Sequence, residues 1–154
     1  MRRFICKAAI ILCCSFFVSA HSANAQRLLI WGGENHRTFL GCLNGSPLDS
    51  ESIWNAFGDY GNHFNSTCIW NSFGDFGNPF SSYSPWNEFT TTPPGIYDSK
   101  GKFYGYLTRN KSLPKRIDTE LTDMICVFYD MIPDDVSKWY DKLFKELDLG
   151  ISAK

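Results

Sequence analysis

The chain contains few of the residues and patterns that mark a catalytic or metal-binding site. It has three histidines, of which His36 and His63 lie beyond residue 25. No local pattern combines Ser, His and Asp, or Cys and His, in the way that nucleophilic catalysis requires. No CxxC motif or Cys/His spacing typical of a zinc site is present. The sequence therefore predicts no catalytic residue, no metal site and no cofactor.

A basic stripe is also missing. The chain has 15 Lys and Arg residues against 16 Asp and Glu residues. Arg2, Arg3 and Lys7 lie near the start, so the rest of the chain has 12 against 16 and a net charge of −4. Such a chain does not attract nucleic acid or an anionic membrane surface. We expect no nucleic-acid partner, and an envelope protein and a glycan remain open as partners.

Residues 1–25 have the three parts of a secretory signal peptide. A basic start is followed by an apolar run from Ala8 to Val18 and by Ala23-Asn24-Ala25, a small-x-small cleavage site. The run is too short to span a bilayer comfortably, and no later stretch could cross a membrane. We expect cleavage after Ala25 and a secreted or periplasmic protein, with residues 26–154 forming one domain.

Three of the six cysteines lie beyond residue 25, namely Cys42, Cys68 and Cys126. An exported protein can form disulfides, and an odd number leaves one thiol unpaired. Cys42 and Cys68 flank the first full unit of a repeat, whereas Cys126 lies in a helical pattern, where a small buried thiol is common. We therefore predict a Cys42–Cys68 disulfide and a free, buried Cys126.

That repeat has a period of sixteen residues and is the most informative feature of the chain. Trp54, Trp70 and Trp86 mark it, and residues 52–67 match residues 68–83 at ten of sixteen positions. A fixed period means that equivalent residues stack in space. Two full units and a partial unit at each end occupy residues 45–92, too few to stand alone. For each unit we predict one helical turn and one short extended piece.

The aromatic residues of the repeat allow two interpretations. The favoured one is that the three tryptophans stack in the core together with the Phe three residues after each, which are Phe57, Phe73 and Phe89. The alternative is a planar aromatic platform for a sugar or a peptide. The residues that would form such a binding platform are Trp54, Trp70, Trp86, Tyr60 and Phe76.

Strand patterns lie on both sides of the repeat. Short apolar runs at residues 27–31 and 38–43 predict two strands joined by a tight loop. Residues 95–108 predict a β-hairpin, in which Gly105 indicates a bulge or a close backbone neighbour. These strands predict a small antiparallel sheet.

The last part of the chain, residues 118–149, has helical patterns. Asp118 is the expected cap of a first helix, and Pro133 ends that helix and opens the next. Six apolar residues between Val136 and Leu147 then line one face, which should pack on the strands. The predicted fold is therefore α+β, with a small antiparallel sheet, the aromatic repeat segment and two C-terminal helices.

Acidic residues supply the main alternative to a binding role. Asp59 and Asp75 occupy equivalent positions of the repeat, and Asp98 lies in the turn of the predicted hairpin. One acid per unit is few for calcium, and Asp is common in turns. A small extracytoplasmic hydrolase acting on glycan or nucleic acid could use these acids if they converged in a cleft with raised pKa values.

The repeat and its flanks also resemble a known group of proteins. The runs that carry the resemblance are Phe39-Leu-Gly-Cys-Leu-Asn-Gly45, Asp49-Ser-Glu-Ser-Ile-Trp-Asn55, Gly101-Lys-Phe-Tyr-Gly-Tyr-Leu-Thr108 and Asp134-Asp-Val-Ser-Lys-Trp-Tyr140. Over residues 28–144 the chain is similar to small exported bacterial proteins with tandem Ser-Ile-Trp-Asn repeats. That group has no assigned activity, so the resemblance implies export and a single domain but no catalytic residue.

The resemblance also bears on the disulfide. Members of the group often have Cys-Leu-Asn-Cys where this chain has Cys42-Leu-Asn-Gly45, and Cys68 stands where they have Ser. This exchange implies a relocated disulfide partner for Cys42. Taken with the aromatic repeat, the sequence favours an exported cell-envelope or secreted binding or structural module over an enzyme.

Overall fold

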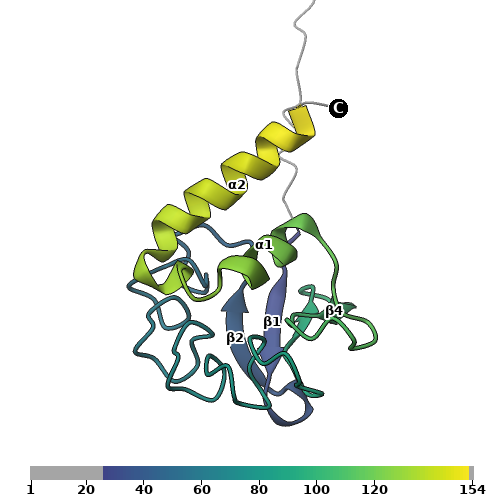
Figure 1. Ribbon diagram of the computed structural model, residues 1–154. Helices are drawn as coiled ribbons and strands as arrows, with labels where there is room; N and C mark the ends of the chain where they lie inside the picture. Colours follow the sequence, from purple (N-terminus) through teal and green to yellow (C-terminus); the bar gives the residue numbers. More distant parts are fainter. Residues whose placement is uncertain (1–25, 153–154) are drawn as a thin grey trace, which may run out of the picture.

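The computed structural model describes residues 26–152, with side chains through Leu147 (Figure 1). The predicted signal peptide at residues 1–25 lies outside this range. Four strands form one antiparallel sheet in the order β2-β1-β3-β4. Their bounds are β1 Leu29–Gly32, β2 Thr38–Cys42, β3 Gly95–Tyr97 and β4 Phe103–Tyr106, and the 3-10 turn η1 (Glu34–His36) joins β1 to β2. With the two helices described below, the predicted α+β fold is confirmed.

The sheet brings together the two hairpins that flank the repeat. In β1, Leu29 lies opposite both Cys42 of β2 and Tyr97 of β3. Gly105 in β4 has a φ of 144°, and a Cβ there would lie 2.9 Å from the carbonyl oxygen of Lys115. This close backbone neighbour, beside a register shift between β3 and β4, is what the glycine predicted.

The repeat segment, residues 45–92, contains no helix and no extended strand. It is a series of linked turns, in which a backbone N–H bonds the carbonyl three residues earlier, as from Asn55 to Ser52 and from Asn71 to Cys68. One turn in each full unit is longer, because a backbone N–H bonds the carbonyl four residues earlier, as from Asn62 to Gly58. This longer turn brings the period to sixteen residues. The predicted helical turn and extended piece are therefore wrong. Ser and Asn side chains at the turn starts bond the backbone locally and so compete with regular structure.

The three repeat tryptophans form a buried column. Their side chains are 0–2% exposed, and the ring centroids lie 5.6 Å apart between Trp54 and Trp70 and 5.3 Å apart between Trp70 and Trp86. Each indole N–H also donates to a backbone carbonyl earlier in the chain, that of Trp54 to Leu43. Trp70 donates to Ile53 and Trp86 to Ile69, in both cases seventeen residues back, at 2.7 and 2.6 Å. The predicted core role of the tryptophans is confirmed, and the column joins one unit to the next.

The helices follow the predicted order. Helix α1 (Glu120–Phe128) begins after Thr119, whose side chain forms a capping box with Thr122, so the cap is one residue later than predicted. The 3-10 turn η2 (Ile132–Asp134) contains Pro133, and α2 (Val136–Ser152) follows. Pro133 thus lies between the helices, but it does not end α1, which stops at Phe128, or open α2, which starts at Val136. No helix in the described part of the chain is long and apolar enough to cross a membrane.

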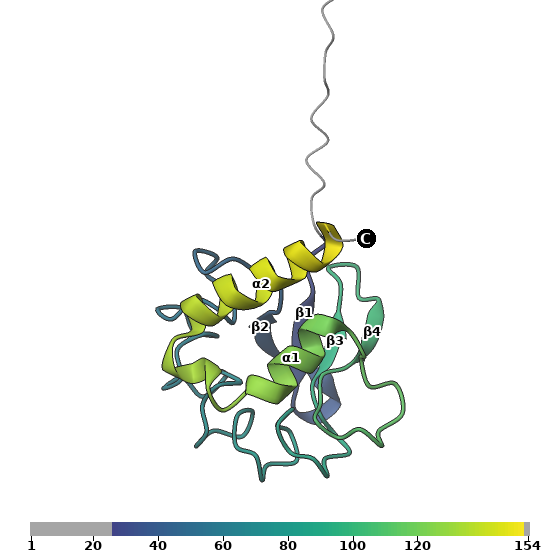
Figure 2. The same ribbon diagram turned by 45° about the horizontal axis from the view of Figure 1, so that its top comes forward.

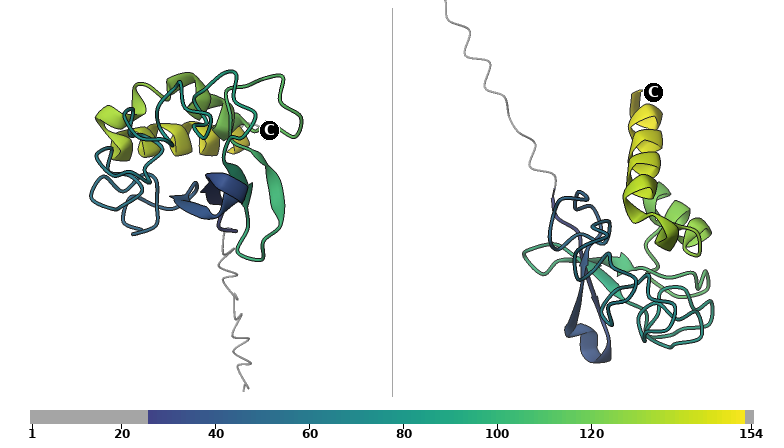
Figure 3. Two further views of the ribbon diagram at one scale, coloured as in Figure 1. Left: turned by 90° about the horizontal axis from the view of Figure 1, so that it is seen from below. Right: turned by 90° about the vertical axis from the view of Figure 1, so that its left-hand side faces the viewer.

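Helix α2 packs on the repeat segment and on α1. The rings of Tyr140 and Phe144 lie 6.0 and 6.2 Å from that of Trp54, and Trp139 lies 4.9 Å from Phe128 of α1. We predicted packing on the strands, but α2 instead covers the Trp54 end of the column. Figures 2 and 3 show α2 running beside α1, with the looped repeat segment next to both helices.

All three described cysteines are free and buried. Cys42 pairs through a single β-bridge with Ser52, and its thiol donates to Asn44 Oδ1 at 3.4 Å. Cys68 occupies the position that Ser52 and Ser84 hold in the other units. It therefore lies one full unit after Ser52, the residue that pairs with Cys42. The predicted Cys42–Cys68 disulfide is therefore not formed in this structure, whereas Cys126 is free and buried as predicted.

Candidate binding surface

The repeat segment presents six large apolar side chains to solvent in two sixteen-residue series. The first row is Phe57, Phe73 and Phe89, which are 98%, 95% and 86% exposed. The second row is Leu48, Phe64 and Phe80, which are 94%, 83% and 92% exposed. We predicted that the first row lies in the core, and that prediction is wrong. The tryptophans fill the core without these rings.

An Asn-x-Phe sequence holds each phenylalanine of the two rows at the corner of a turn. The asparagines are Asn55, Asn62, Asn71, Asn78 and Asn87, and each Oδ1 accepts the N–H of the Phe two residues later at 2.9–3.1 Å. In the first row the asparagine Nδ2 also donates to a carbonyl six residues earlier. These bonds fix the corners without help from the Phe rings. The fivefold Asn-x-Phe pattern was the sequence signal for this surface.

Because the two rows are exposed, the free protein lacks the hydrophobic stabilisation that burial of these side chains would give. Each such side chain would gain about 1.5–3 kcal/mol by burial. Single exposed apolar residues are normal on proteins, whereas a contiguous group of them marks an interaction surface. In the part of the chain that the structure describes, Phe57, Phe73, Phe80 and Phe89 make no ring contact with another aromatic residue or cation. Their ring faces are therefore free to meet a partner.

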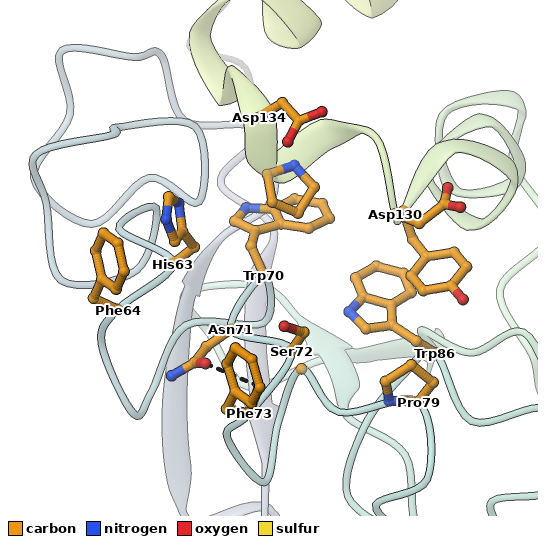
Figure 4. Close-up of a pocket in the computed structure, with 13 residues that line it drawn as sticks. His63, Phe64, Trp70, Asn71, Ser72, Phe73, Pro79, Trp86, Asp130 and Asp134 are labelled. Atoms are coloured by element: carbon orange, nitrogen blue, oxygen red, sulfur yellow. Dashed lines mark hydrogen bonds between the residues drawn. The ribbon is translucent and has the colours of Figure 1, made fainter.

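A groove of about 690 Å³ lies between these rows and the α1–η2 connection (Figure 4). Phe64 and Phe73, one from each row, line it from the repeat segment, and Asp130 and Asp134 lie at its opposite edge, with their carboxylates turned away from these two rings. The other lining residues are His63, Trp70, Asn71, Ser72, Gly77, Pro79, Trp86, Tyr129 and Pro133. The groove therefore has aromatic side chains on the side of the repeat segment and two acidic residues at its opposite edge.

The tryptophans offer little ring surface in this groove. Trp86 is stacked between Trp70 and Tyr129, with both centroid distances at 5.3 Å. The guanidinium of Arg109 lies 4.4 Å from the centre of the Tyr129 ring and closes that end of the column. The ring surface that a ligand can reach is consequently that of Phe73 and the part of Phe64 that His63, at 4.1 Å between ring centroids, does not cover.

The surface is acidic as well as apolar. Residues 45–92 contain five acidic residues and no Lys or Arg, the acids being Asp49, Glu51, Asp59, Asp75 and Glu88. Arg27 pairs with Asp49 and Glu51, and Arg109 pairs with Glu88. Asp59, Asp75, Asp130 and Asp134 have no ion pair within the described residues. Four carboxylates of the repeat and the groove are thus left without a cation.

The residues that we considered from the sequence for an aromatic platform lie deeper in the structure. Trp54, Trp70 and Trp86 are in the core, and Tyr60 and Phe76 are half-buried against it. The Tyr60 ring contacts Phe39 at 4.9 Å, and that of Phe76 contacts Tyr83 at 6.4 Å. Of the five, only Trp70 and Trp86 line the groove. The phenylalanine rows supply the exposed aromatic surface instead.

The acids considered for a hydrolase do not meet in one cavity. Asp59 accepts a hydrogen bond from Asn65 Nδ2 at 3.2 Å. Asp98 lies in the β3–β4 turn, where it lines a separate cavity that contains neither Asp59 nor Asp75. The backbone N–H groups of Lys102 and Lys100 bond Asp98 and lower its pKa, whereas a catalytic acid needs a raised one. Within residues 26–152 no group of three His, Cys, Asp or Glu residues could hold a metal ion.

The comparisons with known proteins add no function. No family model matches the chain, and neither a curated protein nor a solved structure does. The two rows and the groove are therefore the basis for assigning a role.

Proposed function

We propose that the protein is an exported binding module, secreted or held in the cell envelope, and that it binds its partner with the two rows and the groove. The observation that carries the proposal is the pair of regular series of nearly fully exposed apolar side chains. Export rests on the signal-peptide pattern at residues 1–25 and on the resemblance described above.

The construction of the repeat supports binding over a purely structural role. The tryptophan column joins successive units, and the Asn-x-Phe bonds hold the corners. Removing the exposed rings would leave both sets of contacts in place. The rings therefore contribute little to folding, and a partner that covers them gains the burial free energy that the free protein forgoes.

Repetition also strengthens binding. Equivalent side chains at a fixed interval can contact several groups of one partner, and each contact raises the effective concentration for the next. A single phenylalanine gives a weak contact, whereas a row of three gives a cooperative one. We therefore expect affinity to fall steeply as rings are removed from the first row.

A triple variant tests the proposal. In Phe57→Ser/Phe73→Ser/Phe89→Ser we expect thermal melting close to that of the wild type, because the rings are exposed. Binding to the sedimentable envelope fraction of the source organism should be lost, as measured by co-sedimentation. The control is Val127→Ser, which removes an apolar side chain that is 68% exposed on α1, outside the rows and the groove. Equal retention of the triple variant and the control would refute the proposal.

A further inference from the structure

We propose that the partner is a polypeptide segment that carries both apolar and basic side chains, and that the groove holds one of its Lys or Arg side chains. This inference rests on the proposed function and names the class of partner. Two observations carry it, namely the charge of the repeat and groove and the composition of the groove.

Charge complementarity limits what can cover the rows. The repeat segment has no Lys or Arg, and Asp59, Asp75, Asp130 and Asp134 lack ion pairs within the described residues. Anionic polymers and anionic membranes would be repelled. A second copy docked face to face would bring the same carboxylates together, because a two-fold interface matches a patch with itself. A basic partner removes the repulsion, and opposite charges also speed association.

The groove has the parts that bind a long basic side chain. Asp130 and Asp134 supply carboxylates at the edge of the groove, and the rings of Phe73 and, beside its contact with His63, Phe64 are accessible. A cation within about 6 Å of a ring centre is attracted by the ring quadrupole. The methylene stem of Lys or Arg packs well on apolar walls while its head remains near carboxylates and water. The volume of about 690 Å³ is ample for one such side chain.

The rows supply the remaining contacts. Apolar side chains of the segment lie between the exposed rings of Phe57, Phe73 and Phe89, as anchor residues do in protein interfaces. A neutral glycan could stack on the same rings but would leave the four carboxylates without a cation. Its binding would also be insensitive to salt, whereas that of a basic segment weakens as salt rises.

The experiment uses fluorescence anisotropy with labelled synthetic peptides. The probe alternates arginine and leucine, and its two controls alternate glutamate and leucine or arginine and serine. We expect the mature protein to bind the Arg/Leu peptide more tightly than either control. In Asp130→Asn/Asp134→Asn the affinity for that peptide should fall about tenfold or more, because a charge pair is lost. Asp141→Asn/Glu146→Gln, which removes two exposed charges of α2, should keep wild-type affinity.

The outcomes separate this inference from the proposed function. Wild-type affinity in Asp130→Asn/Asp134→Asn, combined with loss in Phe57→Ser/Phe73→Ser/Phe89→Ser, would overturn the basic partner and leave the binding surface intact. Binding of cellohexaose or chitohexaose without binding of the Arg/Leu peptide would identify a glycan surface and overturn the inference equally. Wild-type affinity for the peptide in both variants would place the binding elsewhere and contradict both proposals. The single variant Asp130→Asn serves if the double variant does not fold.

Discussion

Asn71 links the backbone of one turn to that of another with a single side chain. Its Oδ1 accepts the N–H of Phe73 at 3.0 Å, and its Nδ2 donates to the carbonyl of Asn65 at 3.0 Å. We expect Asn71→Ala to lower the free energy of unfolding by about 1–3 kcal/mol, since two hydrogen bonds are lost. Asn71→Asp keeps the acceptor and loses the donor, so its loss should be about half as large. Urea denaturation of the two variants measures this, and equal losses would show that the Phe73 corner bond contributes nothing.

Cys68 is a buried thiol whose pKa lies well above its ordinary value. Burial raises the pKa of its thiol from 9.0 to about 12, and burial likewise raises that of Cys126 to about 11. A raised pKa gives stability that is fully present below pH 9 and is lost as the pH rises toward 11 and 12. We therefore expect the free energy of unfolding to decrease steadily above pH 9. Urea unfolding at pH 8 and pH 10.5 measures the decrease.

The matched control for Cys68 is already present in the repeat. Ser52 and Ser84 hold the same position, and their hydroxyls accept the N–H groups of Trp54 and Trp86. Cys68→Ser should therefore fold with a stability within about 1 kcal/mol of the wild type at pH 7. It should also lose stability less steeply above pH 9, because the raised pKa of Cys68 is removed and only those of Cys42, Cys126, Tyr60 and Tyr97 remain to act in this range. An unchanged slope would mean that Cys68 is not the group that titrates.

Within one unit of the repeat, Trp70 and Phe73 have opposite roles although they lie three residues apart. Trp70 is 2% exposed and Phe73 is 95% exposed. Trp70→Ala should lower the free energy of unfolding by about 3–5 kcal/mol, since it removes a buried ring and a buried hydrogen bond. Phe73→Ala should change it by less than about 0.5 kcal/mol. Chemical denaturation of both variants checks this. A large loss in Phe73→Ala would show that the first row packs in solution.

This contrast also shows why the sequence predicted the elements better than the candidate surface. Short apolar runs, turn residues and a helical period identified the strands, the hairpin and the stripe of α2, because those signals lie within the segments that form the elements. A period of sixteen shows which residues occupy equivalent positions, but it does not show whether those positions are buried or exposed. The buried Trp70 and the exposed Phe73 both recur every sixteen residues, so the period could not distinguish core positions from surface positions. The groove depends on contacts between residues 63–86 and 129–134, which no local pattern records.

At the scale of the molecule, α2 closes the open end of the tryptophan column. Tyr140 and Phe144 contact Trp54, the hydroxyl of Ser137 donates to the Trp54 carbonyl at 3.3 Å, and Leu143 is fully buried. Removing the helix would expose apolar surface worth on the order of 10 kcal/mol. That is comparable to the whole stability of a typical domain, about 5–15 kcal/mol. The repeat cannot compensate, because so few units do not stand alone.

We therefore expect a chain that ends at Pro133 to be unfolded or aggregated when produced, with no cooperative melting transition by circular dichroism. The matched control is a chain that ends at Leu147, which keeps the contacts of Tyr140 and Phe144 with Trp54. It should melt cooperatively and close to the full chain. If the shorter chain also melted cooperatively with unchanged tryptophan fluorescence, α2 would be a separable element, and the column would be stable with Trp54 uncovered. The difference in stability between the two truncated chains thus measures the contribution of residues 134–147, which cover Trp54.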